Sequence, residues 1–289
     1  MRFFVAPQTV ELAYRVIGDG AQQAVLIHDW GMNGRSWDEL LSRWRPESLA
    51  IYVPDLRGCG DSPRPAAGYG LDMMLDDLVR FFDDHDLDDV VVVGQGMGAA
   101  LAQMLAAFEP GRVSRLVLIN PCPATGVPMS PALMALHERA ISRQVDRLQL
   151  LSLGLNRQPG PAAHCGLHRL ERGADTIEER MLAESFPAWQ KAWFPEMLAK
   201  IRCPVLALAG SHDPILKSYV VVDEVVTPMR NARLEVLPSA SHNLSTEQPA
   251  AVSAAIERFR RAPVAVISTR SGARQSSGGH MAGNVATGA

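Results

Sequence analysis

Short apolar segments alternate with amphipathic helical segments along most of this chain, and this alternation limits the fold more than any other feature. The helical segments include 35–45 and 71–85, where apolar side chains recur on one face. The apolar runs lie at 24–28 (AVLIH), 49–54 (LAIYVP), 90–94 (VVVVG), 115–120 (RLVLIN) and 204–210 (PVLALAG). Such runs are typical of strands buried on both faces of a sheet. The pattern predicts an α/β fold with a mostly parallel central sheet flanked by helices.

The alternation stops after residue 120 and resumes near residue 201. The intervening segment contains two proline-bounded helical stretches, 131–153 and 175–199. We therefore expect an α/β core from 1–120 and 201–262, with 121–200 forming a helical cap. Residues 263–289 lack acidic residues and apolar periodicity, which predicts a flexible tail.

Composition excludes several classes of protein. With 289 residues, 47% hydrophobic and 20% charged, the chain can bury a large core, and its net charge of −3 argues against a nucleic-acid partner. No apolar run is long enough to span a membrane, and the first residues do not resemble a secretion signal. Four scattered cysteines favour reduced thiols. We expect a cytoplasmic protein with a small-molecule partner.

A glycine-rich turn joins the apolar run at 90–94 to a helix at 98–108, with the sequence Gly94-Gln95-Gly96-Met97-Gly98. Glycines in such a turn permit positive φ and close backbone approach. A G-x-S-x-G nucleophile elbow occupies this strand–turn–helix position in α/β hydrolases. Other segments fit the same comparison: His28-Asp29-Trp30-Gly31, VPDLRGCGDSPRP (53–65), GSHDPI (210–215) and PSASHNLSTEQP (238–249).

On these motifs, residues 10–262 resemble the α/β-hydrolase superfamily, particularly its capped esterases, lactonases and non-haem haloperoxidase-like members. The resemblance implies that Asp213 is the acid and His242 the base of a catalytic triad. It assigns the oxyanion-binding N–H groups to Trp30 and Met97. The nucleophile position falls on Gly96. No metal or cofactor is implied.

Glycine has no side chain, so an acyl-enzyme on residue 96 is impossible. His242, oriented by Asp213, can still activate a water for hydrolysis or abstract a proton from the substrate, which leads to lyase, cyclase, isomerase or cofactor-free oxygenase chemistry. The sequence therefore favours an enzyme for an apolar carbonyl compound, such as an ester, lactone or thioester. Two alternatives stay open: a catalytically silent binding protein, and an ordinary serine esterase inactivated by a Ser-to-Gly change.

Asp29 also departs from the family pattern, which usually has glycine after the histidine. Its carboxylate either faces the site, where it opposes a developing oxyanion, or points away. Epoxide hydrolases have a nucleophilic aspartate in an HDWG motif, but Ile27 precedes His28 here, which favours a loop on the oxyanion side. The remaining predicted pocket residues are His28, Gln95 and Cys122. For Cys122, an inert thiol is favoured over a substitute nucleophile.

Two features of the segment 121–200 bear on a possible metal site and on the substrate pocket. His164, Cys165 and His168 form an H-C-x-x-H pattern, but no other ligand cluster accompanies it, so no metal is predicted. Aromatic residues of the same segment either shape an apolar substrate pocket or pack the cap against the core: Phe186, Trp189, Trp193 and Phe194.

Overall fold

The computed structural model describes residues 8–155, 167–168, 170–171, 174 and 176–263. A seven-stranded sheet in the order β1-β3-β2-β4-β5-β6-β7 forms its centre. β1 runs antiparallel to β3, and every other pair in this sheet is parallel, which confirms the predicted α/β fold. The strands are β1 (Tyr14–Ile17), β2 (Gln22–Ile27), β3 (Leu49–Pro54), β4 (Val90–Gln95), β5 (Val113–Ile119), β6 (Val205–Gly210) and β7 (Ala232–Leu237).

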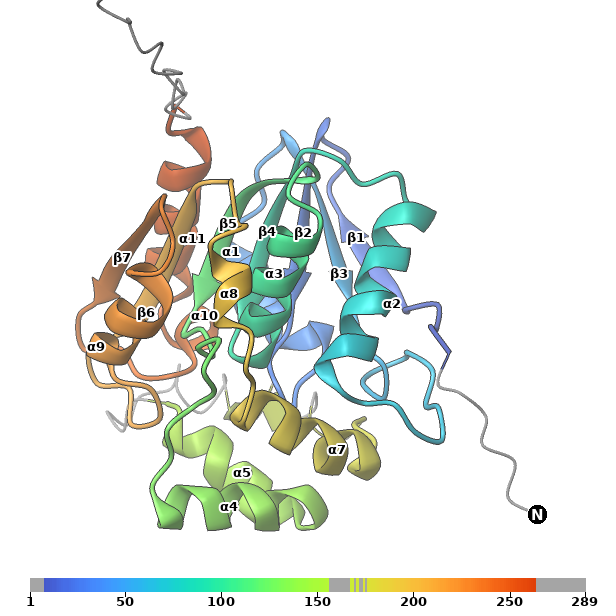
Figure 1. The fold of residues 1–289 in the computed structure, drawn as a ribbon, viewed down its shortest axis with the longest axis vertical. Coiled ribbons are helices and arrows are strands. Elements are labelled where there is room, and N and C mark those ends of the chain that lie inside the picture. Colours follow the sequence, from blue (N-terminus) through green and yellow to red (C-terminus); the bar gives the residue numbers. More distant parts are fainter. Residues whose placement is uncertain (1–7, 156–166, 169, 172–173, 175, 264–289) are drawn as a thin grey trace, which may run out of the picture.

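Helices cover both faces of the sheet (Figure 1). Successive side chains of a strand point to opposite faces. Accordingly, Val90 and Val92 belong to one hydrophobic cluster and Val91 and Val93 to the other. The first cluster includes residues of α2 (Leu71–Asp84) and α3 (Met97–Phe108), and the second includes residues of α1 (Asp38–Arg43) and α11 (Pro249–Arg261). Because both faces are packed, β4 is buried along its whole length.

The segment between β5 and β6 is helical where the structure describes it. It contains α4 (Pro131–Ser142), α5 (Gln144–Leu153), α7 (Glu179–Gln190) and α8 (Pro195–Leu198). Figure 1 shows α4, α5 and α7 grouped at one end of the sheet. The helical stretch predicted at 131–153 consists of two helices, because Arg143 has an extended backbone with φ −121° and ψ 111°. The helix expected at 175–199 is likewise divided, between α7 and α8.

Short helical elements complete the described chain: η1 (Gly34–Trp37), α9 (Ser218–Val221), the π-helical η2 (Val222–Val226) and α10 (Leu244–Glu247). A buried ion pair joins the loop after β3 to α2. Arg57 Nε lies 2.5 Å from Asp77 Oδ2, and a second guanidinium nitrogen donates to Asp77 Oδ1 at 2.6 Å. This bidentate pair fixes the loop that borders the functional site.

None of the described helices is both long enough and apolar enough to cross a membrane. Residues 264–289 of the predicted tail lie outside the described residues.

Candidate active site

The turn between β4 and α3 has a backbone that glycine adopts readily. Gly96 has φ +53° and ψ −117°, and its N–H donates to the Ile119 carbonyl at 3.0 Å. Gly98 allows α3 to approach β2 closely because it has no side chain. A Cβ built on Gly98 would overlap the carbonyl oxygens of Ile27 and His28. The glycines therefore position the first N–H of α3, on Met97, at the carboxyl ends of the central strands.

His242 and Asp213 come together from two loops at this edge of the sheet. His242 Nδ1 lies 2.7 Å from Asp213 Oδ2. The other carboxylate oxygen of Asp213 accepts hydrogen bonds from the N–H groups of Ile215 and Leu216, at 2.7 and 2.9 Å. The backbone N–H of His242 donates to the carbonyl of Gly154, just after α5. Asp213 thus orients the imidazole, while the Gly154 carbonyl holds the backbone of His242.

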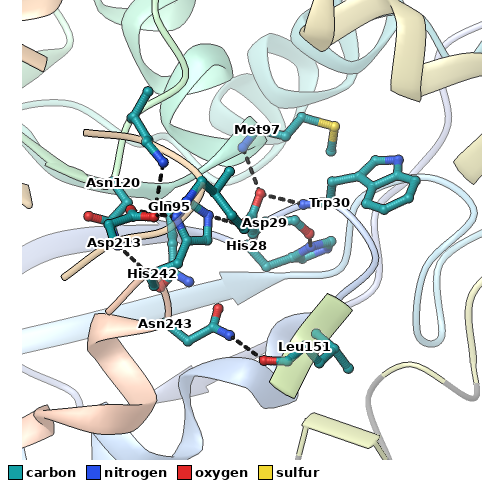
Figure 2. Close-up of polar contacts among 12 residues, drawn as sticks. His28, Asp29, Trp30, Gln95, Met97, Asn120, Leu151, Asp213, His242 and Asn243 are labelled. Atoms are coloured by element: carbon teal, nitrogen blue, oxygen red, sulfur yellow. Dashed lines mark hydrogen bonds and ion pairs between the residues drawn. The ribbon is translucent and has the colours of Figure 1, made fainter. Parts of the chain in front are cut away.

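Asp29 points into the site, and its two carboxylate oxygens have different surroundings (Figure 2). Oδ1 accepts hydrogen bonds from the N–H groups of Trp30 and Met97, both at 2.7 Å. Oδ2 lies 3.8 Å from His242 Nε2. A carboxylate is favoured here because Met97 opens α3, whose N-terminus carries a partial positive charge. The N–H pair assigned to a substrate oxyanion is therefore engaged by Asp29.

A side chain on residue 96 would compete with the Asp29 carboxylate for the same space. A Cβ built on Gly96 would overlap the Asp29 carboxylate, including both of its oxygens. A side chain at residue 96 and this orientation of Asp29 therefore exclude one another. The carboxylate occupies the space in which a residue-96 side chain would begin.

His242 lies between two carboxylates, which changes its protonation. Burial lowers the pKa of the imidazole, but Asp213 and Asp29 together outweigh burial and raise the pKa of His242 to about 10. A raised pKa favours the ring that carries both protons. A ring in that state is an acid, so the role of His242 as a base, which stays a prediction, requires that it first give up one proton.

A largely apolar pocket opens beside these groups. It contains about 550 Å³ of space, counting the part open to solvent, and Asp29, Gly96 and His242 reach it from the sheet edge. Asn120 and Asn243 also reach it. Its apolar wall is formed by residues of α5, α7 and several loops: Met32, Val127, Leu150, Leu151, Trp189, Ile215 and Leu216. Such a lining fits a small, mostly apolar ligand.

Four rings pack together at one side of this pocket, and we call them the aromatic cluster: Trp30, His137, Phe186 and Trp189. Every pair has ring centroids between 5.2 and 6.0 Å apart. Trp193, by contrast, is 73% exposed. His137 was not predicted as a site residue. Its position next to Leu136 and Ala140, on the buried side of α4, is the one feature of the sequence that could have indicated it.

Two predicted pocket residues lie behind the site instead of lining it. His28 is fully buried; its Nε2 accepts from the Leu56 N–H at 2.9 Å and its Nδ1 donates to the Asp29 carbonyl. Burial lowers its pKa, so the ring is neutral and supports the loop that carries Asp29. The side-chain oxygen of Gln95 accepts from the Ser245 hydroxyl at 2.6 Å. Neither side chain is among those that line the pocket.

Cys122 lines the pocket as a protonated thiol. Burial, with a smaller contribution from the charge of Asp29, raises its pKa well above the ordinary value, and a thiol is a poor nucleophile.

No group of His, Cys, Asp and Glu side chains suited to a metal ion occurs among the residues that the structure describes. His168 contacts Glu171 at 2.9 Å, whereas His164 and Cys165 lie outside the described residues.

Comparisons with known proteins give a consistent result. A family profile described as "Alpha/beta hydrolase family" matches residues 24–255. A non-heme haloperoxidase of Rhodococcus erythropolis is 26% identical over 273 residues, which cover 90% of this chain and 99% of that protein. A pimeloyl-[acyl-carrier protein] methyl ester esterase of Pectobacterium carotovorum is 26% identical over 263 residues, covering 87% and 99%.

Solved structures share the fold. A bromoperoxidase from Bacillus anthracis superimposes with a TM-score of 0.80 at 20% identity, covering 88% of this chain and 96% of that one. At this identity the likeness extends to the fold alone.

Proposed function

Because this chain belongs to the alpha/beta hydrolase family, we propose that it is an enzyme that acts on an apolar carbonyl compound without a serine nucleophile. In this proposal His242 and Asp29 transfer the protons. One observation carries it: the Asp29 carboxylate lies between the Trp30 and Met97 N–H groups on one side and His242 on the other. This arrangement places an acid and a base side by side at an apolar pocket.

Gly96 is the vacant nucleophile position of the elbow in this proposal. Loss of a serine alone would leave empty space there. The overlap between a residue-96 Cβ and Asp29 supports a coordinated replacement, in which a carboxylate fills the space of the missing side chain. It also argues against an ordinary serine esterase with a single inactivating change, because Asp29 as oriented leaves no room for a serine.

The proposed reaction is proton transfer next to a carbonyl. The protonated Nε2 of His242 donates to the substrate carbonyl oxygen, while Asp29 Oδ2 accepts a proton from the adjacent carbon. Asp213 holds the imidazole and stabilises its charge. The products are an enol, a protonated Asp29 and a neutral His242, and return of the two protons at new positions completes an isomerisation.

Water-mediated hydrolysis has less support. It requires His242 to accept a proton, yet the pKa of about 10 keeps the ring protonated at neutral pH. It also requires free donors for the oxyanion, and Asp29 Oδ1 engages both of them.

Deuterium exchange tests the proposal without knowledge of the natural substrate. The protein is incubated with acetophenone in deuterated buffer, and loss of the methyl proton signal is followed by NMR. We expect the wild type to accelerate exchange, and His242→Gln and Asp29→Asn each to slow it at least about 100-fold. Asp76→Asn, which changes an exposed carboxylate on α2, should leave the rate unchanged.

Equal exchange rates in wild type and both site variants, with folding verified by circular dichroism, would contradict the proposal. Binding of acetophenone without accelerated exchange would favour the silent binding protein instead.

A further inference from the structure

We propose that His137 is a specificity-determining residue, whose Nε2 accepts a hydrogen bond from a hydroxyl or N–H group on the substrate. The ligand class that this selects is a planar aromatic carbonyl compound bearing such a donor on its ring. The inference rests on the proposed function only in taking the carbonyl group as the part of the ligand that faces His242.

The tautomer of His137 is fixed by a single backbone contact. Its Nδ1 lies 2.8 Å from the carbonyl oxygen of Leu133, one turn earlier in α4. A carbonyl oxygen can only accept, so Nδ1 carries the proton. In the neutral ring Nε2 is then an acceptor without a proton. Among the described residues, no group is hydrogen-bonded to Nε2.

The ring also stays neutral at physiological pH. Burial lowers the pKa of His137, and the nearby positive charge of His242 lowers it further, which outweighs the opposing effects of the Leu133 carbonyl and Asp29. An imidazolium here would be a donor at both nitrogens. The neutral ring instead has one acceptor, Nε2, and His137 is among the residues that line the pocket.

Neighbouring rings hold His137 in place and define the shape that fits beside it. His137 stacks on Phe186 with an angle of 8° between the ring planes and centroids 5.2 Å apart. Trp30 and Trp189 pack against it at 5.6 and 5.8 Å, and both line the pocket. Flat walls of this kind favour a planar ring, which can stack or meet them edge-on.

A hydrogen-bond acceptor at the pocket wall discriminates between ligands. A ligand that covers Nε2 without donating leaves a buried acceptor unsatisfied, which is unfavourable by about 1–3 kcal/mol. A ligand with a donor at that place avoids this cost. We therefore expect a preference of about 10-fold or more for the hydroxylated ligand.

Direct binding measurements test the inference. The probes are 2-, 3- and 4-hydroxyacetophenone and the three matching methoxyacetophenones, titrated by calorimetry. The wild type should bind at least one hydroxy isomer about 10-fold or more tightly than its methoxy counterpart. In His137→Phe, which keeps an aromatic ring but removes Nε2, the ratio should fall to about one. His137→Gln, which restores an acceptor, should recover part of the preference.

His85→Phe provides the matched control, because His85 belongs to a different ring group, with Tyr14 and Phe81. It should leave the preference intact. Equal binding of all hydroxy and methoxy pairs by the wild type would overturn the inference, and so would a preference that survives in His137→Phe.

The two proposals fail separately. A hydroxyl preference without deuterium exchange would contradict the proposed function alone. Exchange that depends on His242, without a hydroxyl preference, would contradict only the role of His137.

Discussion

The orientation of the Asp29 carboxylate depends on the absence of a side chain at Gly96. A carboxylate on the loop after β2 is common enough on protein surfaces, yet this one has two backbone donors, an imidazolium neighbour and the space left by a glycine. Each feature favours this orientation of the Asp29 side chain. Together they explain how a buried charge is tolerated beside an apolar pocket.

This pairing predicts a non-additive effect on esterase activity. Gly96→Ser alone should not hydrolyse p-nitrophenyl acetate, because the new Cβ overlaps the Asp29 carboxylate. Adding Asp29→Gly removes the carboxylate and frees both N–H donors. We expect the double variant to exceed the sum of the single variants about 10- to 100-fold in initial rate. Additive rates would argue against the steric match.

Among the elements, the close approach of α3 to β2 is what brings the Met97 N–H to Asp29. A Cβ on Gly98 would overlap two backbone carbonyls of that neighbouring segment. We expect Gly98→Ala to lower the free energy of unfolding by at least about 2 kcal/mol, measured by urea denaturation. Gly111→Ala is the matched control, because a Cβ there meets nothing within 4 Å. Similar losses in both variants would contradict this role of Gly98.

The sequence contained enough information for the order of elements and for the turn that carries Gly96. Apolar runs and helical periodicity are local properties, so the parallel sheet could be predicted from them. The break between α4 and α5 at Arg143 could not be predicted in this way. No proline or glycine occurs at the break, and the two helices pack against each other. The direction of the Asp29 side chain could not be predicted for a similar reason: one of the two donors that fix it, the Met97 N–H, comes from a distant part of the chain.

His137 shows the same limit. Its helix spacing resembles that of an ordinary core residue, and only the assembled aromatic cluster places it beside the pocket. Folding brings together groups far apart in the chain: the β2 loop, the elbow, the loop after β6, the loop after β7 and the cap segment.

The stability of the whole molecule should depend on pH through His242. Its pKa is about 10 in the folded state and about 6.5 when unfolded. The folded state therefore holds the proton more tightly, so the stabilisation is complete below pH 6.5 and is lost as the pH rises towards 10. The difference in unfolding free energy between wild type and His242→Gln should shrink from pH 6 to pH 10 in urea titrations. A constant difference would contradict this linkage.

The position of the Asp29 carboxylate beside His242 can be measured through the imidazole itself. In ¹⁵N-labelled protein, the ring nitrogens of His242 are titrated by NMR in the wild type, in Asp29→Asn and in the Asp76→Asn control. We expect a midpoint near pH 10 in the wild type and in the control, and a midpoint lower by at least about one pH unit in Asp29→Asn. Equal midpoints in the wild type and in Asp29→Asn would show that the Asp29 carboxylate does not face the imidazole.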